Sequence, residues 1–187
     1  MKIITIENVL LYHSKIIKAT GWSDGVRDIG LVESAIGRAG TSFDGIDVYK
    51  TDIEKIVKDL GAAAFGVSDL QDYRDFIQQF SGDSFKGLNR GISVAVPFPS
   101  MVIEQLLEGP TLTYLYYYNV VNILLDQIGL KVSNYLQLQG FSAFPIPSSL
   151  RVSKDKMHGI FPHRLSAYLA GIGWIGKSNL IISPKYG

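Results

Sequence analysis

The sequence predicts an α/β (α+β) fold in which a small helical N-terminal segment precedes a sheet-and-helix domain. From Thr51 onward, amphipathic helical patterns alternate with short runs rich in β-branched residues. Most of the helical patterns end at a glycine. The chain has 187 residues, of which 47% are hydrophobic, so it can bury one good core with a small appendage.

The first unit, residues 1–51, predicts two short helices. Residues 6–17 carry apolar side chains at helical spacing behind Thr5, a residue type that caps helix N-termini. A polar turn separates them from a second helix over residues 31–39, which ends at Gly40. Two small helices cannot close a core, so this unit needs a partner.

The second unit, residues 52–187, carries the alternating pattern. The expected helices span residues 52–60, 72–80, 100–107, 114–139 and 162–170, and the expected strands span residues 63–67, 92–96, 141–146 and 180–182. Glycines at positions 61, 140 and 171 are the expected helix stops. Residues 147–159 form a polar loop inserted within this domain.

Composition excludes several classes of function. A net charge of +1 gives no global basic field for nucleic acid or an anionic membrane. The absence of cysteine removes disulfides, thiolate nucleophiles and cysteine-held metals or clusters from these residues. Glu7 interrupts any signal peptide, and the longest apolar stretch, residues 112–125, is shorter than the roughly 20 residues of a membrane span. We expect a cytoplasmic chain with no membrane partner, and the three scattered histidines predict no metal site.

The octapeptide Gly171–Ser178, GIGWIGKS, matches two phosphate-binding patterns, G-x-x-x-x-G-K-[ST] and G-x-G-x-x-G. Both patterns act in a glycine turn that follows a strand and precedes a helix. Here the expected helix precedes the octapeptide and the expected strand follows it, which argues against nucleotide binding. A P-loop with Lys177 on the phosphate is kept only as a minor alternative.

Residues 6–13, 25–35 and 43–49 resemble the start of death-on-curing proteins of the Fic superfamily, above all in the run GVRDIGLVESA. The nucleotide-handling loop of that family, His-Pro-Phe-x-x-Gly-Asn-Lys-Arg, is absent from this sequence. The resemblance therefore implies no adenylylating or phosphorylating activity. It leaves this incomplete segment as a surface for a protein partner.

Residues from about 52 to 187 resemble the epoxyqueuosine reductase-like corrinoid iron–sulfur proteins. The matching stretches are residues 60–67, 92–97, 109–111, 144–148 and 170–178. In that family the last stretch belongs to the cobalamin-binding domain, so the resemblance implies a cobalamin-binding-type fold and a cobalamin cofactor. The family also holds two four-iron four-sulfur clusters through cysteine runs, which this chain lacks and therefore cannot bind.

The resemblance implies a corrinoid pocket around the octapeptide. The cofactor-binding residues it implies are His163, Arg164, Gly171, Gly173, Trp174, Gly176, Lys177 and Ser178. Glycines allow close approach of backbone to a flat macrocycle, Trp174 can pack on it, and Lys177 and Ser178 can bond its amides or phosphate. The alternative is a glycine-rich turn with Trp174 in the core.

The resemblance does not extend to the catalytic acid. No acid stands where the proton-donating aspartate of the queuosine enzymes would fall, and Asp155 is the candidate replacement because it is the only carboxylate in the loop 147–159. The function implied is the cobalamin-binding part of a reductase whose substrate is a tRNA or a small molecule. Basic residues such as Lys86 and Arg90 either face that substrate or form a solvated rim, and the solvated rim is the default interpretation. Whether this chain alone is an enzyme is left open. The alternative function is a non-catalytic interaction module without a cofactor.

Overall fold

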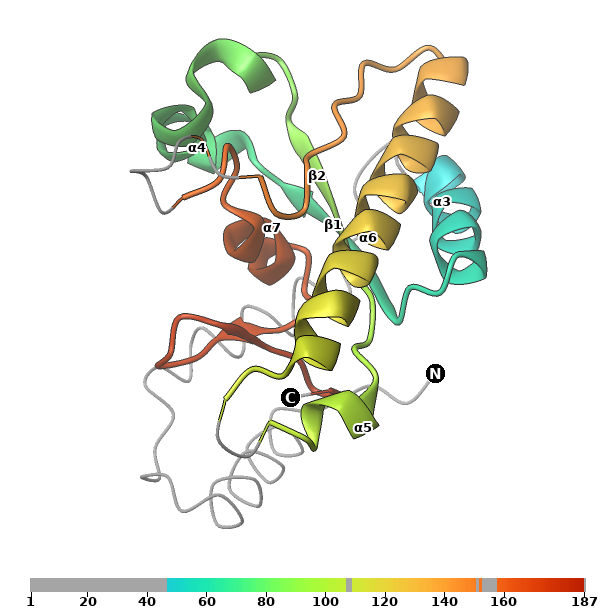
Figure 1. The fold of residues 1–187 in the computed structure, drawn as a ribbon. Helices are drawn as coiled ribbons and strands as arrows, with labels where there is room; N and C mark the ends of the chain where they lie inside the picture. Colours follow the sequence, from blue (N-terminus) through green and yellow to red (C-terminus); the bar gives the residue numbers. More distant parts are fainter. Residues whose placement is uncertain (1–46, 107–108, 151, 153–157, 187) are drawn as a thin grey trace.

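The computed structural model describes residues 47–106, 109–150, 152 and 158–186, so the two helices expected in residues 6–17 and 31–39 and the candidate Asp155 lie outside the described residues. The elements are α3 (Asp47–Asp59), β1 (Ala64–Asp69), η1 (Gln71–Tyr73), α4 (Arg74–Ser81), η2 (Gly82–Phe85), β2 (Arg90–Ala95), α5 (Ser100–Ile103), α6 (Leu112–Leu138), α7 (His163–Leu169), β3 (Trp174–Ile175) and β4 (Ile181–Ile182). Figure 1 shows the long α6 crossing the front of the molecule. The described chain mixes helices with two small antiparallel sheets, which confirms the α+β class.

The larger sheet pairs β1 with β2 in antiparallel register, from Ala64 opposite Ala95 to Asp69 opposite Arg90. Side chains alternate between the two faces of a strand. One face of this sheet therefore carries apolar side chains and the other carries small ones. The apolar face consists of Phe65, Val67, Ile92 and Val94, and the small-residue face of Gly66, Ser68, Gly91 and Ser93.

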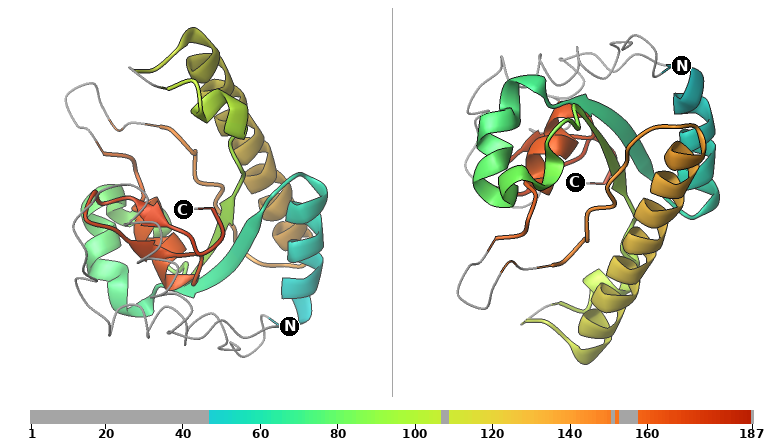
Figure 2. Two further views of the ribbon diagram at one scale, coloured as in Figure 1. Left: turned by 90° about the horizontal axis from the view of Figure 1, so that it is seen from below. Right: turned by 90° about the horizontal axis from the view of Figure 1, so that it is seen from above.

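Each face of the sheet is covered by its own group of helices (Figure 2). On the apolar face, α3 and α6 bury Ile53, Val57, Ile128 and Val132 against the strands. A second core joins Leu70 and Ile77 to Leu169 of α7 on the other side. The sheet is thus the middle layer, with α3 and α6 on one side and α4 and α7 on the other.

Helix α7 lies close to the sheet because the strands present almost no side chain to it. A Cβ atom added at Gly66 would overlap the backbone carbonyl oxygen of Ala170, at the end of α7. A Cβ atom added at Gly91 would lie 2.6 Å from the hydroxyl oxygens of both Ser68 and Ser166. The two glycines are therefore required for this approach.

The expected glycine stops are confirmed at the ends of α3, α6 and α7. Gly61, Gly140 and Gly171 have φ angles of +95°, +87° and +72°, which glycine adopts without steric cost. At each end, the glycine N–H donates to the carbonyl three residues earlier, and the next N–H donates to the carbonyl five residues before itself. These paired bonds are the Schellman arrangement, which satisfies the last carbonyls of a helix.

The strand expected over residues 141–146 is wrong. Pro145 and Pro147 lack the N–H that a sheet ladder requires, and other bonds tie the segment to α6 instead. The Phe141 N–H donates to Leu136 at 3.0 Å, and the Ser148 N–H donates to the Asp126 carboxylate at 2.7 Å. The segment therefore runs extended beside β2 without pairing to it.

Smaller differences concern the lengths of elements. The helix expected over residues 100–107 is limited to α5 in the described chain, and residues 72–80 divide between η1 and α4. Helix α6 passes through Gly129 without a break, as predicted, and Thr111 caps it by accepting the Tyr114 N–H at 3.1 Å. No helix among the described residues, α6 included, meets the length and hydropathy needed to cross a bilayer.

Two glycine-to-alanine changes should move stability in opposite directions. Gly66→Ala places a methyl group on the backbone of α7 and should lower the free energy of unfolding by about 1–3 kcal/mol. Gly129→Ala lies inside α6, where the new methyl group meets Pro145 at an ordinary 3.9 Å, and should raise it by about 0.5–1 kcal/mol. Chemical denaturation of both variants measures the difference. Equal stability of the two variants would contradict the close approach of α7.

Candidate functional site

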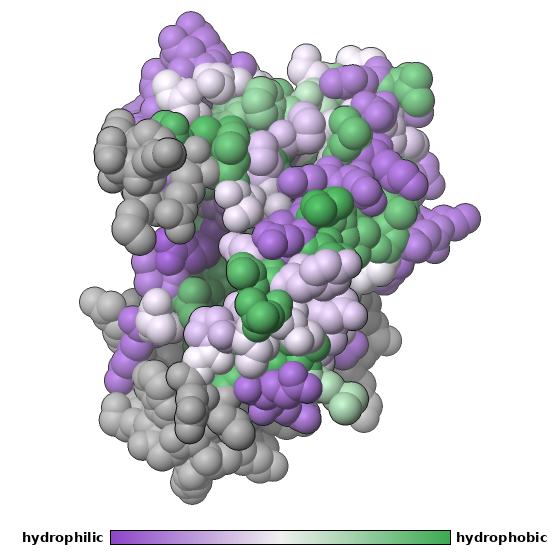
Figure 3. All heavy atoms as spheres, viewed as in Figure 1, coloured by the Kyte–Doolittle hydropathy of each residue, from purple (hydrophilic) through white to green (hydrophobic). Residues whose placement is uncertain are grey.

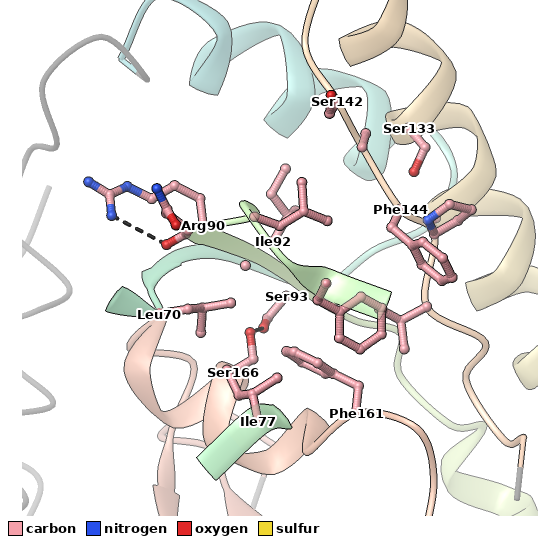
Figure 4. A pocket seen from close by; sticks show the side chains of 18 of the residues that line it. Leu70, Ile77, Arg90, Ile92, Ser93, Ser133, Ser142, Phe144, Phe161 and Ser166 are labelled. Carbon is pink, nitrogen blue, oxygen red and sulfur yellow. Dashed lines mark hydrogen bonds between the residues drawn. The ribbon is translucent and has the colours of Figure 1, made fainter. Parts of the chain in front are cut away.

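A cavity of about 1020 Å³ lies beside the free edge of β2, between α6 and α7. Its walls come from β2, α4 with η2, α6, α7 and the segment 140–148. Ligand-binding clefts in proteins reach about 1000 Å³, so this cavity can hold a molecule of cofactor size. Side chains from β2, α4, α6, α7 and the segment 140–148 line it, and Figure 4 shows several of them.

The cavity walls are mainly apolar. Ile77, Ile92 and Ile128 contribute aliphatic surface from three different elements. Three phenylalanines form an aromatic group, in which the ring of Phe85 lies edge-on to Phe144 at 5.0 Å and to Phe161 at 5.6 Å. Such walls favour a ligand with a large apolar body, and polar groups among them can set its orientation.

The first polar group is a chain of serine hydroxyls where α7 meets the sheet. The hydroxyl oxygen of Ser166 lies 2.9 Å from that of Ser93 and 3.1 Å from that of Ser68. Ser68 donates its proton to the carbonyl oxygen of Gly91 at 3.1 Å. Ser68 and Ser166 are buried, whereas Ser93 is half-buried, and both Ser93 and Ser166 line the cavity.

The second polar group is Ser133 of α6, which lines the opposite wall. The residue is only 6% exposed, and its hydroxyl makes no hydrogen bond with any described residue. A buried hydroxyl without a partner costs free energy, so such a group marks a place where a ligand or water is needed. Figure 4 shows its oxygen directed away from the helix axis.

His163 lies at the rim of the cavity, at the start of α7. Its ring stacks edge-on against Phe161 at 5.8 Å. Desolvation by the surrounding protein lowers the pKa of the His163 imidazole, while a hydrogen bond to the Pro147 backbone and the charge of Asp126 act in the opposite direction. The ring is therefore neutral near pH 7 and can contact a ligand without carrying charge.

Charged side chains gather at the end of the cavity where β2 begins. Arg90 pairs with Asp69 at 2.6 Å, and Arg74 donates to the side-chain carbonyl of Asn89. Lys86, also at this end, is exposed. Among the described residues, no group of three histidine or acidic side chains is placed to hold a metal ion.

The octapeptide forms a hairpin outside the cavity. Trp174 and Ile175 form β3, which pairs with Ile181 and Ile182 of β4. The predicted order of helix α7, octapeptide and strand β4 is confirmed, but the short strand β3 inside the octapeptide was missed. The helix N-terminus that a P-loop places after its glycines is therefore not there.

The glycines of the octapeptide are explained by the hairpin itself. Gly171 ends α7, and a Cβ atom at Gly173 would overlap the carbonyl oxygen of Ile182. A Cβ atom at Gly176 would lie 2.5 Å from the side chain of Ile182. Asn179, with φ of 60°, completes a three-residue turn in which the Gly176 N–H donates to Leu180 at 2.8 Å.

The predicted cofactor-binding residues consequently separate into two places. Only His163 lines the cavity, while Arg164 turns to the hairpin and donates to the carbonyl oxygen of Asn179. Trp174 is half-buried in β3, and Lys177 and Ser178 are exposed at the hairpin turn. The octapeptide and the cavity are thus different surfaces, joined only through α7.

Sequence reasoning missed Ser93, Ser133 and Ser166, which supply hydroxyls to the cavity. Each stands where an apolar pattern predicts core: Ser93 within the strand ISVAV, Ser133 in the stripe of α6 and Ser166 in α7. A hydroxyl at a core position was the available signal. No protein-family model, curated protein or solved structure matches this chain.

Proposed function

We propose that residues 52–187 are the corrinoid-binding part of an epoxyqueuosine reductase-like oxidoreductase and that the corrinoid occupies the cavity beside β2. The observation that carries the proposal is the cavity of about 1020 Å³ with mainly apolar walls. The resemblance of residues 60–67, 92–97 and 170–178 to that family selects the corrinoid among large ligands.

The residues present suit such a ligand. The rings of Phe85, Phe144 and Phe161 offer apolar and edge contacts to a macrocycle, and the hydroxyl of Ser133 lacks a partner among the described residues. The neutral imidazole of His163 would contact the ligand at the rim. When bound, a corrinoid supplies low-valent cobalt chemistry for a reductive step such as removal of an epoxide oxygen.

The part of this chain in that reaction would be to bind, orient and exclude water. The aliphatic and aromatic walls would keep water from the reacting face of the ligand, which strengthens every polar contact inside. These residues contain no cysteine to hold a cluster, so we assign electron delivery to clusters held outside them. A tRNA or small-molecule substrate would approach from the charged end, near Lys86.

Titration of the purified chain with cob(II)alamin tests the proposal and locates the site. We expect a spectral shift and retention of the corrinoid through gel filtration. Ser142→Trp adds a large ring at an exposed position of the cavity wall and should weaken retention at least ten-fold. Lys177→Ala, at the hairpin turn, should stay within two-fold of the unaltered chain.

Loss of binding in Lys177→Ala with normal binding in Ser142→Trp would move the corrinoid to the octapeptide, as the resemblance alone predicts. An unaltered chain that neither shifts the spectrum nor retains the corrinoid would refute the proposed function.

A second candidate function, an interaction module, is favoured by the surface of α6. Tyr116, Val120, Ile123 and Leu130 are 65%, 40%, 58% and 52% exposed. Their spacing of four, three and seven residues places them on one side of the helix, where a second helix can pack. Figure 3 shows apolar residues along the front of the molecule, over the course of α6.

The simplest partner for this face of α6 is α6 of a second copy. We expect the average mass from light scattering to rise with protein concentration, and the double variant Ile123→Glu, Leu130→Glu to remain monomeric because charges oppose burial. Both positions are exposed, so an unchanged circular dichroism spectrum is the control. Identical mass profiles for the variant and the unaltered chain would exclude this face from self-association.

A further inference from the structure

The free edge of β2 offers backbone groups to the cavity. In an antiparallel ladder, residue pairs alternate between those that exchange hydrogen bonds and those whose N–H and C=O groups point outward. The Leu70 N–H donates to Asn89 at 2.9 Å, which makes Gly91, Ser93 and Ala95 the residues bonded to β1. The N–H and C=O groups of Ile92 and Val94 therefore point away from β1.

These outward groups have no backbone partner in the described chain. No backbone hydrogen bond joins Ile92 or Val94 to the segment 141–147, which is held by α6. Both residues are half-buried and line the cavity. Half-buried backbone groups favour a partner strongly, so the edge presents alternating donors and acceptors to whatever enters.

The serine chain adds an acceptor beside this edge. Ser68 uses its only proton on the carbonyl of Gly91, so Ser166 must donate to Ser68, and Ser93 must donate to Ser166. This is the one direction that satisfies all three contacts. The proton of Ser93 is thereby committed, and its oxygen can only accept a hydrogen bond from a ligand. Figure 4 shows Ser93 and Ser166 side by side.

We propose that the cavity recognises uncharged carboxamide groups, through the outward edge of Ile92 and Val94, the acceptor oxygen of Ser93 and the hydroxyl of Ser133. A carboxamide has N–H donors for Ser93 and the backbone carbonyls, and an oxygen for the backbone N–H groups. A carboxylate has no donor, and it would bring its charge against the oxygens of Ser93 and the strand. The inference rests on the proposed cavity, but not on the ligand being a corrinoid.

The charged end of the cavity is separate from this subsite. Arg90 stands three residues before Ser93 on β2. Because a strand rises about 3.3 Å per residue, the Cα atoms of Arg90 and Ser93 lie roughly 10 Å apart. The guanidinium of Arg90 is also paired with Asp69. A small acid held at Ser93 would therefore not reach the compensating charge of Arg90.

The test uses a matched pair of small probes, 2-naphthamide and 2-naphthoate, which share one apolar body. At pH 7 the acid is ionised, because carboxyl groups titrate near pH 4. Calorimetry should give at least ten-fold tighter binding of the amide by the unaltered chain. In amide-proton NMR spectra, the Ile92 and Val94 resonances should shift on addition of the amide.

Two variants separate recognition from general effects on folding. Ser93→Ala should reduce the ratio of amide to acid affinity at least three-fold, and Ser133→Ala should weaken the amide without strengthening the acid. Ser84→Ala, an exposed serine of η2 that does not line the cavity, is the matched control and should leave the ratio unchanged.

The inference is overturned if neither probe binds, if the acid binds as tightly as the amide, or if Ser93→Ala keeps the ratio of the unaltered chain. These outcomes differ from failure of the proposed function. A chain that prefers the amide but ignores cob(II)alamin keeps the carboxamide subsite and loses the corrinoid. A chain that retains cob(II)alamin but shows no preference for the amide keeps the corrinoid and loses the carboxamide subsite.

Discussion

The close contact of α7 with the β1–β2 sheet is the constraint on which the rest of the structure depends. The contact exists because Gly66 and Gly91 leave room for the backbone and the Ser166 hydroxyl of α7. The three serines then satisfy one another in a buried position where unpaired hydroxyls would be costly. One contact therefore sets the position of α7, the wall of the cavity and the direction of the hydroxyl chain.

The same contact explains why the residues predicted to bind the cofactor lie in two places. Helix α7 has seven residues, so its two ends are about 10 Å apart at 1.5 Å per residue. His163 stands at the end that opens on the cavity, whereas Gly171 turns the chain into the β3–β4 hairpin at the other end. Residues that are neighbours in the motif, such as Gly173 and Gly176, lie in the hairpin, where the close approach of Ile182 requires glycine.

The sequence predicted best where a local mechanism determines the structure. The stops at Gly61, Gly140 and Gly171 follow from the positive φ angle that a Schellman end requires, and the spacing of apolar residues was enough for α6. The strand prediction for residues 141–146 was wrong because their apolar pattern is typical of a strand. Pro145 and the hydrogen bond from Ser148 to Asp126 determine the conformation instead. The serine chain joins residues up to 98 positions apart, and no local pattern reveals such a contact.

The failure of that strand to form is also what opens the cavity. A third strand on β2 would have satisfied the outward groups of Ile92 and Val94 and filled the space beside them. Because prolines and α6 hold the segment away, the edge remains available, and unpaired edges in natural proteins are normally covered or shortened. Here the edge faces a cavity with mainly apolar walls. The site thus exists because no third strand pairs with the free edge of β2.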